Sequence, residues 1–341
     1  MYVDTAVLPM LSVVIPIYNE QDALPLTVKR LRPILDRLDQ TYEVVAVDDG
    51  SSDSTFVLLQ AMRRDWPELR VVRLYRNCGH QAALSAGLRL ARGRYVASID
   101  ADLQDPPEKI AEMLELAQRD GLDIVYGVRV DRSSDTWTKR RTAGLYYRMM
   151  RGLVGVNVPA HAGDFRLLSR TTVDILKSLP EHQPVYRLLV PWVGLPSGQV
   201  TYAREERVAG RTKYPLRKMV GLAVDSVTNF SAAPLRLATW LGLLSFALCL
   251  LLLTGSIIVY LLGHVVPGWT SLLTAIVFLG AVQLLCLGLL GEYVGRVYSA
   301  VQGRPSYFVG YDSVSADEVV LRPSRSPENA DTPSQYAGLR R

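Results

Sequence analysis

Two carboxylates separated by one residue, Asp100 and Asp102, follow a hydrophobic run in the segment Ser98-Ile99-Asp100-Ala101-Asp102-Leu103-Gln104. Side chains at positions i and i+2 of an extended segment point to the same side, so both carboxylates can close on one cation. A hard divalent ion shared with a diphosphate suits that geometry. The alternative is a solvated acidic loop, so the rest of the chain must decide between the two.

Polar side chains also follow two other strand-like runs. Tyr18 could stack on a flat base, and Glu20 could accept hydrogen bonds. Residues 48–53 follow the second run, and an acidic residue at such a strand end commonly holds ribose hydroxyls or a base N–H. The same segment could be a turn followed by a helix N-cap at Ser52 or Asp53, and neither role excludes the other.

Glycine-rich phosphate loops are absent from the sequence. Neither Gly-x-Gly-x-x-Gly nor Gly-x-x-x-x-Gly-Lys occurs, which disfavours a dinucleotide Rossmann site and a P-loop NTPase. A diphosphate would then have to be held by a metal and by side chains, which is the role open to Asp100 and Asp102.

The elements that must position these residues alternate between β-rich runs and amphipathic segments. This pattern predicts an α/β fold, a mostly parallel sheet with helices on its faces. In such sheets the ligand sits beyond the carboxyl ends of the strands, where residues 18–20, 48–51, 76–81 and 100–105 would meet. We expect strands at 12–17, 42–47, 70–75, 95–100 and 123–127, and helices at 22–38, 53–65, 80–91 and 107–120.

The pattern loosens after residue 127. We expect a polar linker at 131–135, a helix at about 139–152, and a mixed region from 164 to 207. Residues 216–230 have the apolar spacing of a helix that lies along a membrane surface.

A long uncharged region indicates a membrane portion. The chain has 341 residues, of which 49% are hydrophobic, and no Asp, Glu, Lys or Arg occurs from Leu237 to Gly291. Two apolar stretches, about 237–262 and 270–290, are each long enough to cross a hydrocarbon core about 30 Å thick. Two buried helices of a soluble core are disfavoured, because core helices rarely run so long without a charge. We therefore expect a transmembrane hairpin.

Basic residues flank this hairpin at its outer ends and are absent from its short loop. By the positive-inside rule both termini lie in the cytoplasm, in an inner-membrane protein with two spans. The net charge of +5 points to anionic lipid or substrate, and no nucleic-acid motif accompanies it, so no nucleic-acid partner is expected. The three cysteines form no Cys-x-x-Cys pair, which indicates neither a zinc site nor a disulfide framework.

Five segments in order resemble a known enzyme family. They are Val14–Glu20, Val47–Asp53, Arg76–Ala83, Asp100–Pro107 and Gly163–Arg170. Together they resemble family 2 glycosyltransferases of GT-A fold, and most nearly the polyprenyl-phosphate glycosyltransferase branch, which includes bactoprenol glucosyltransferases and dolichyl-phosphate mannose synthases. The resemblance implies a GT-A, Rossmann-like catalytic domain followed by interfacial helices and a two-helix transmembrane hairpin.

The resemblance assigns donor-binding roles residue by residue. Nucleoside contacts would come from Pro16, Tyr18, Glu20, Val47 and Asp49. The diphosphate and a Mg²⁺ or Mn²⁺ cofactor would be held by Asp100, Ala101, Asp102 and Gln104, with Asp100, Asp102 and Gln104 as the metal ligands.

The resemblance also assigns basic residues to the donor. Arg129 and Arg140 resemble the family's phosphate-facing arginines. Arg207 and Lys213 match a basic loop that closes over the donor. Arg211 departs from the pattern of that loop, where relatives often carry a smaller or acidic residue, so the details of the loop do not transfer.

Three residues are expected to act in catalysis: Asp102, Asp164 and Arg166. Asp164 matches the residue usually proposed as a base, but a phosphate acceptor is already a good nucleophile because its second pKa is about 6, so Asp164 could instead orient the acceptor or the metal. Arg166 could bind the acceptor phosphate in a bidentate way or could form a structural ion pair. The histidines His80, His161 and His182 lack metal-ligand spacing, and we expect solvated or structural roles for them.

These expectations give a domain plan. Residues 1–210 form the cytoplasmic catalytic domain, 211–236 the juxtamembrane helices, 237–291 the two spans, and 292–341 a cytoplasmic segment that is disordered from about 312.

The expected activity is an inverting transfer of one sugar, most readily from UDP-glucose, to polyprenyl (undecaprenyl or decaprenyl) phosphate at the cytoplasmic face of the membrane. A GDP-mannose-dependent transferase is the alternative. A processive polysaccharide synthase is disfavoured because the Gln-x-x-Arg-Trp motif and further spans are missing. A silent membrane scaffold is disfavoured because the whole acidic set is intact. Relatives imply a homo-oligomer, such as a tetramer, packed through the spans.

Overall fold

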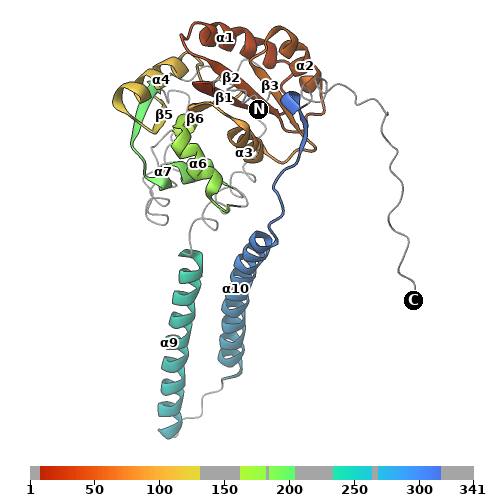
Figure 1. The fold of residues 1–341 in the computed structure, drawn as a ribbon. Helices are drawn as coiled ribbons and strands as arrows, with labels where there is room; N and C mark the ends of the chain where they lie inside the picture. Colours follow the sequence, from red (N-terminus) through yellow and green to blue (C-terminus); the bar gives the residue numbers. More distant parts are fainter. Residues whose placement is uncertain (1–7, 131–161, 182–183, 204–232, 263–267, 316–341) are drawn as a thin grey trace, which may run out of the picture.

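The computed structural model describes residues 8–130, 162–181, 184–203, 233–262 and 268–315. An eight-stranded sheet lies at its centre, in the order β7-β5-β6-β4-β1-β2-β3-β8 (Figure 1). Strands β1 to β4 pair in parallel, whereas β6 and β8 run antiparallel to their neighbours. The strands are β1 (Leu11–Ile17), β2 (Tyr42–Asp48), β3 (Leu69–Leu74), β4 (Tyr95–Ser98), β5 (Ile124–Arg129), β6 (Ala162–Ser169), β7 (Ser197–Tyr202) and β8 (Val309–Asp312).

Helices cover both faces of this sheet. Side chains alternate between the two faces of β1: Val13 and Ile15 join the core beneath α1, α2 and α4, whereas Val14 joins the core beneath α3, α6 and α7. Burial on both faces accounts for the continuous hydrophobic runs of the strands and confirms the α/β architecture. The helices are α1 (Leu24–Asp36), α2 (Thr55–Asp65), α3 (His80–Leu90), α4 (Lys109–Asp120), α6 (Arg170–Ser178) and α7 (Tyr186–Val193).

The first four parallel strands fall where the sequence predicts them, within two residues at each end. The expected mixed region up to residue 207 is more ordered than predicted, since it contains β6, α6, α7 and β7. Ser169 begins α6 as a side-chain N-cap, accepting a hydrogen bond from the amide of Thr172. The helices expected at 139–152 and 216–230 lie outside the described residues.

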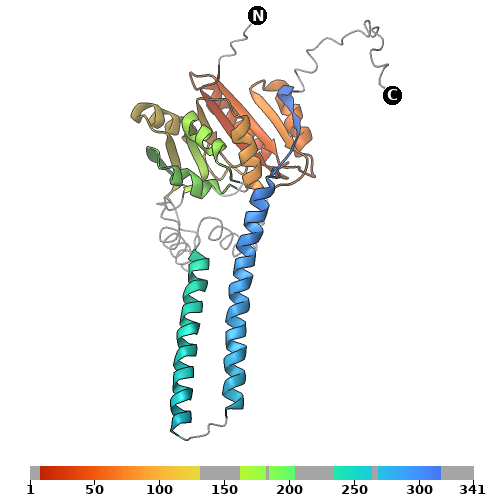
Figure 2. The ribbon, with the colours of Figure 1, turned by 60° about the horizontal axis from the view of Figure 1, so that its bottom comes forward.

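Two long helices extend from the α/β unit (Figure 2): α9 (Ala233–Leu261) and α10 (Trp269–Gln302). Both are long and apolar enough to cross a membrane, and their apolar windows are not buried by the protein itself. Leucines such as Leu244, Leu251 and Leu284 are exposed along them, and soluble proteins rarely leave so large an apolar surface uncovered. The second helix continues beyond the expected end at 290 to Gln302, and Glu292 and Arg296 form an ion pair one turn apart in this extension.

The chain returns from α10 to the sheet. Gly303 ends α10 in a left-handed conformation, and β8 then pairs antiparallel with β3 at the sheet edge (Figure 1). The described order extends through residue 315, slightly past the expected boundary at about 312, since Asp312 is paired with Arg70 and Ser313 is fully buried.

Candidate active site

The carboxyl ends of β1, β2 and β3 lead into three connected segments, residues 18–20, 48–53 and 76–79, which we call the β1–β3 loops. The amide of Asn19 donates to Ser51 Oγ (2.9 Å), and the amide of Ser52 donates to Asn19 Oδ1 (2.9 Å). Asn19 adopts φ +52°, a conformation that asparagine tolerates better than most residues. Hydrogen bonds in both directions thus join the first loop to the second.

Asp49 joins the second loop to the third. Its carboxylate accepts hydrogen bonds from the amides of Cys78 (2.7 Å) and Gly79 (2.8 Å). Burial raises the pKa of Asp49, and these two hydrogen bonds oppose that rise. Gly50, at φ +65°, allows this close approach, because a Cβ there would lie 2.6 Å from the carbonyl carbon of Arg76.

The predicted nucleoside contacts differ in their accessibility. Tyr18 is 38% exposed, which leaves its ring free to meet a planar ligand. Pro16 and Val47 are register partners in the middle of the sheet, and their buried side chains leave only main-chain atoms for such a contact. The amide of Glu20 donates to Thr55 Oγ1 (3.0 Å), which fixes the end of the first loop against α2.

A second group of residues gathers at the ends of β4 and β6, and we call Asp100, Asp102, Asp164, Arg166 and His80 the β4–β6 cluster. Ser98 pairs with Arg166 across the two antiparallel strands. Because antiparallel positions run in opposite directions, Asp100 comes opposite Asp164. His80, at the start of α3, lies between them, with Nε2 3.4 Å from Asp164 and 3.7 Å from Asp100.

Asp164 is held by contacts to both carboxylate oxygens. Arg166 donates to Oδ1 (2.5 Å), and Gln81 donates to Oδ2 (3.2 Å). Burial by itself would raise the pKa of Asp164, but the hydrogen bond with His80 and the charges of Arg166 and Arg187 lower it well below its usual value. These contacts favour the ionised form of the carboxylate.

Arg166 is almost fully buried. Besides Asp164, its guanidinium donates to the carbonyls of Gly163 (3.1 Å) and Tyr186 (2.9 Å). Of the two roles expected for this residue, the geometry favours the structural ion pair, because only 2% of its side chain is exposed to a ligand. A direct contact between Arg166 and an acceptor stays a prediction.

Hydrogen bonds from α1 and from the following residues hold the Asp100–Asp102 segment in place. Thr27 of α1 donates to the carbonyl of Ala101 (2.7 Å), and the amide of Gln104 donates to Asp102 Oδ1 (3.2 Å). Enclosure in the site raises the pKa of Asp100 to about 6; His80 opposes this rise, and the charge of Asp164 adds to it. Crowded carboxylates of this kind favour a cation in their midst.

The donor set of this segment fits a cation shared with a ligand. No group of three His, Cys, Asp or Glu side chains in the described part of the chain is arranged to hold a metal by itself. Asp100 and Asp102 nevertheless offer hard carboxylate oxygens, and Mg²⁺ is commonly bound by one or two carboxylates together with substrate phosphates and water.

Arg129 lies at the end of β5 and is bound to protein groups. It donates to Asp105 (3.2 Å) and to the Tyr202 hydroxyl (3.1 Å), and Asp105 is itself buried. A Cβ on Gly163 would lie 3.4 Å from this guanidinium, so Arg129 borders the β4–β6 cluster. The three other basic residues predicted to bind the donor, Arg140, Arg207 and Lys213, lie outside the described residues.

The sequence places His80, Gln81 and Asp105 at the ligand edge, within residues 76–81 and 100–105, without assigning them to the site, and the structure gives them contacts with predicted site residues. The expectation of a merely solvated or structural His80 missed its place between two carboxylates. A usable signal was present, because His80 and Gln81 lie within residues 76–81, the segment that follows the third predicted strand at the ligand edge. Their contact with Asp164 depends on β6, whose pairing with β4 was not predicted.

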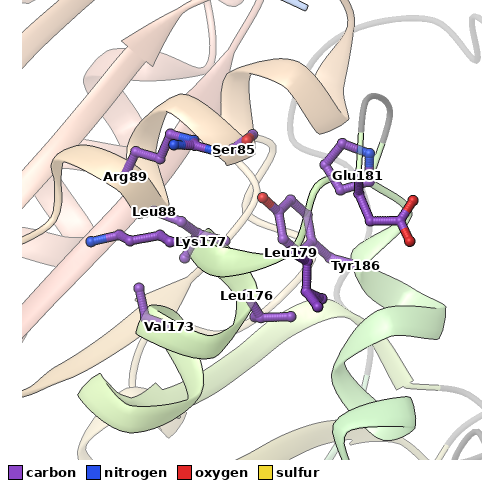
Figure 3. Close-up of a pocket in the computed structure, with 10 residues that line it drawn as sticks. Ser85, Leu88, Arg89, Val173, Leu176, Lys177, Leu179, Glu181 and Tyr186 are labelled. Atoms are coloured by element: carbon purple, nitrogen blue, oxygen red, sulfur yellow. The ribbon is translucent and has the colours of Figure 1, made fainter. Parts of the chain in front are cut away.

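A separate pocket lies between α3, α6 and the segment that leads into α7 (Figure 3). Arg89 and Lys177 line it from the two helices, and Tyr186 lies among its lining residues. None of the predicted donor-binding residues lines this pocket, so we do not assign it to the donor.

Known proteins resemble the chain over most of its length. Residues 12–176 match the family described as Glycosyl transferase family 2, and residues 233–297 match the GtrB C-terminal hairpin. The uncharacterized glycosyltransferase YkcC of Bacillus subtilis is 40% identical over 87% of this chain and 92% of that protein. The bactoprenol glucosyl transferase of Shigella phage SfII is 39% identical over 88% of this chain and 97% of that protein.

A solved structure is also similar to the chain. It is glucosyl-3-phosphoglycerate synthase from Mycobacterium tuberculosis in complex with Mn²⁺, UDP-glucose and phosphoglyceric acid. It is 19% identical, with a TM-score of 0.49, over 65% of this chain and 78% of that one.

Proposed function

The chain belongs to glycosyl transferase family 2 and carries a GtrB-type C-terminal hairpin, and from this we propose that it transfers one sugar from a nucleotide-sugar to a polyprenyl phosphate. We take UDP-glucose as the donor. We infer the polyprenyl-phosphate acceptor from the relatives named bactoprenol glucosyl transferase, which resemble this chain over nearly their whole length. The product would be a polyprenyl-phosphate-sugar with inverted configuration at the anomeric carbon.

One observation carries the proposal: the two halves of the carboxyl edge offer complementary chemistry. The β1–β3 loops carry an exposed aromatic ring at Tyr18 and a buried carboxylate at Asp49, which suits a nucleoside. The β4–β6 cluster presents carboxylates at the point where the diphosphate would follow. A sugar attached to that diphosphate would lie near Asp164.

Asp100 and Asp102, with Gln104, would hold Mg²⁺ or Mn²⁺ against the diphosphate. Such an ion supplies electrostatic stabilisation of the leaving nucleoside diphosphate. The protein's own part is to present these oxygens in a fixed place, which the bond from Thr27 to the main chain of Ala101 achieves. Arg129, at the border of the cluster, adds positive charge on the side of the phosphates.

In the transfer itself, an acceptor phosphate oxygen forms a bond to the anomeric carbon while the bond from that carbon to the diphosphate oxygen breaks. A phosphate with a second pKa of about 6 is largely a dianion near pH 7, so it needs no strong base. We propose that Asp164, fixed by the buried Arg166, orients His80 toward the acceptor rather than removing a proton, since both its oxygens already accept bonds.

The acceptor is a lipid, so the site must lie close to a bilayer. We propose that α9 and α10 span the membrane, with the catalytic unit and both termini in the cytoplasm, in keeping with the basic residues that flank the pair. Their exposed apolar faces would contact lipid and, in a homo-oligomer, other copies of the chain.

Transfer of radiolabelled sugar to extracted polyprenyl phosphate tests the proposal. The full chain in detergent is given UDP-glucose, with GDP-mannose in a parallel reaction, and each reaction is repeated with EDTA. We expect label in the lipid phase from UDP-glucose and loss of that label with EDTA. If label enters the lipid phase only from GDP-mannose, the donor is GDP-mannose rather than UDP-glucose. If no common nucleotide-sugar gives label, the proposed transferase activity is refuted.

A further inference from the structure

The strand β8 is fixed firmly to the edge of the sheet. Arg70 of β3 donates two hydrogen bonds to Asp312 (3.0 and 2.6 Å), and both side chains are largely buried. The amide of Val71 donates to the buried hydroxyl of Ser313 (3.0 Å). The chain that follows α10 therefore has one defined position on the catalytic unit (Figure 1).

Aromatic contacts lead from β8 inward. The ring of Tyr311 meets that of Phe56 edge to face, with centroids 5.3 Å apart and planes at 82°. Phe56 lies in the first turn of α2, directly after the second of the β1–β3 loops. Arg73 is the register partner of Tyr311, and its guanidinium lies 4.5 Å from the centroid of the Phe56 ring. The ring of Phe56 thus contacts both members of a cross-strand pair.

Arg73 in turn holds the second loop itself. Its Nε lies 3.2 Å from Oδ2 of Asp48, a fully buried carboxylate, and another nitrogen donates to the carbonyl of Ser51 (3.0 Å). Asp48 also accepts a hydrogen bond from the amide of Ser51 (3.0 Å). Arg73 therefore fixes both ends of the turn that carries Asp49.

We propose that Tyr311, Phe56 and Arg73 form a positioning row through which the C-terminal strand sets the 48–53 loop, and with it the affinity for the nucleotide part of the donor. The inference rests on the proposed function, because it takes the β1–β3 loops as the nucleoside site. The row does not reach the β4–β6 cluster in the contacts that the structure describes. The row therefore affects donor binding and does not change kcat, the turnover of the enzyme with bound donor.

The composition of the row supports positioning over simple core packing. Phe56 and Tyr311 are partly buried and pack against the margin of the core, and Arg73 is 37% exposed, so the row lies at the core's edge rather than within it. An aromatic edge-to-face pair and a stacked guanidinium depend on orientation more than a buried aliphatic contact does. Such contacts restrict the direction in which the loop can move.

Replacing Tyr311 separates the effects on binding and turnover. The full chain in detergent, as wild type and as Tyr311→Ala, is titrated with UDP and with GDP in the presence of Mn²⁺, and the kcat and KM of transfer are measured. We expect the Kd of the preferred nucleotide and the KM of the donor to rise roughly three- to tenfold, while kcat stays within about twofold.

Five further variants define the cause. Tyr311→Phe keeps the ring and should keep wild-type values, and Val57→Ala, at an exposed neighbour of Phe56 on α2, should change neither constant. The double variant Phe56→Ala/Tyr311→Ala should bind nucleotide no more weakly than Phe56→Ala, because the two residues act in series. Arg73→Lys keeps a charge near Asp48 but loses the planar contacts, and it should weaken nucleotide binding to a similar extent.

The outcomes distinguish this inference from the proposed function. Unchanged nucleotide affinity in a folded Tyr311→Ala chain would overturn the positioning row, as would an equal loss in Tyr311→Phe. A wild-type chain that binds nucleotide but transfers no sugar would refute the proposed transfer, and the nucleotide titrations of the variants would still test the row.

Discussion

The two halves of the carboxyl edge are built in different ways. In the β1–β3 loops, side chains mainly bind main-chain amides: Asn19, Ser51 and Asp49 each join one loop to the next. In the β4–β6 cluster, charged side chains mainly contact one another, as Asp164 and Arg166 do. Hydrogen bonds to the main chain fix the conformation of the β1–β3 loops, whereas contacts between charged side chains fix the β4–β6 cluster.

Under the proposed function, this difference separates donor binding from sugar transfer. A loop whose side chains are fixed by main-chain hydrogen bonds can recognise a nucleoside with little change in its own structure. A cluster of paired charges in a partly enclosed site is suited to stabilising charge that develops during a reaction. Substitutions in the two halves should therefore differ in which constant they change.

The largest expected effect is in the β4–β6 cluster. Asp102→Asn removes one of the two carboxylates proposed to hold the cation, and it should lower kcat by about 10³-fold while the chain still inserts into membranes. Transfer of labelled sugar and membrane flotation measure the two properties. Asp120→Asn, at an exposed carboxylate that ends α4, is the matched control and should remain active. Retained activity of Asp102→Asn would make the segment an acidic loop.

The buried ion pair should matter for stability. Arg166→Met leaves Asp164 without its nearest cation in a buried setting, and it should cost about 3–5 kcal/mol of unfolding free energy. Chemical denaturation of the detergent-solubilised chain measures this loss. Arg166→Met/Asp164→Asn removes both charges and should recover part of it. Equal stability of wild type and Arg166→Met would contradict the ion-pair role.

A smaller and different effect is expected in the β1–β3 loops. Asp49→Asn replaces a carboxylate that accepts two amide hydrogen bonds, and it should weaken nucleotide binding by about tenfold with little change in kcat. Titration with UDP and steady-state kinetics measure the two constants, with the exposed Asp65→Asn as control. If Asp49→Asn lowers kcat and leaves nucleotide affinity unchanged, the β1–β3 loops and the β4–β6 cluster do not differ in which constant they control.

The smallest expected effect concerns the edge that supports the β1–β3 loops. Burial alone would raise the pKa of Asp312, but the hydrogen bonds and charge of Arg70 lower it. A lowered pKa contributes stability above the ordinary value of about 4, and this contribution is lost as the pH falls through the folded-state pKa. Asp312→Asn should therefore cost about 1–2 kcal/mol at pH 7, and the gap from wild type should close in acid. A difference in unfolding free energy between wild type and Asp312→Asn that stays constant from pH 7 to pH 3 would contradict the ion-pair role of Asp312.

The parallel half of the fold was predictable because its signals are local. Each of β1 to β4 is a short hydrophobic run that ends at polar residues, and the segments containing Tyr18, Asp49 and Asp100 lie at one edge as expected. Pairing between distant segments was not predictable in the same way. Nothing in the neighbourhood of Asp164 indicates that its strand enters the sheet antiparallel between β4 and β5.

The missed or ambiguous residues have the same cause. His80 has no metal-ligand spacing, and its role appears only when β6 brings Asp164 beside Asp100. Spacing could not decide between the two roles of Arg166 because it does not report burial. The strand β8 is four residues long and lies in a polar C-terminal segment, where composition predicts disorder.

The short connection between α10 and β8 limits how far the catalytic unit can rise from the membrane. Helix α10 ends at Gln302 and β8 begins at Val309, which leaves residues 303–308 as the connection. A chain of that length spans about 20 Å when fully extended. With α10 in the bilayer, as proposed, this edge of the sheet is tethered within that distance of the C-terminal end of the helix. A lipid phosphate at the bilayer surface would then meet an enzyme that searches for it in two dimensions rather than three.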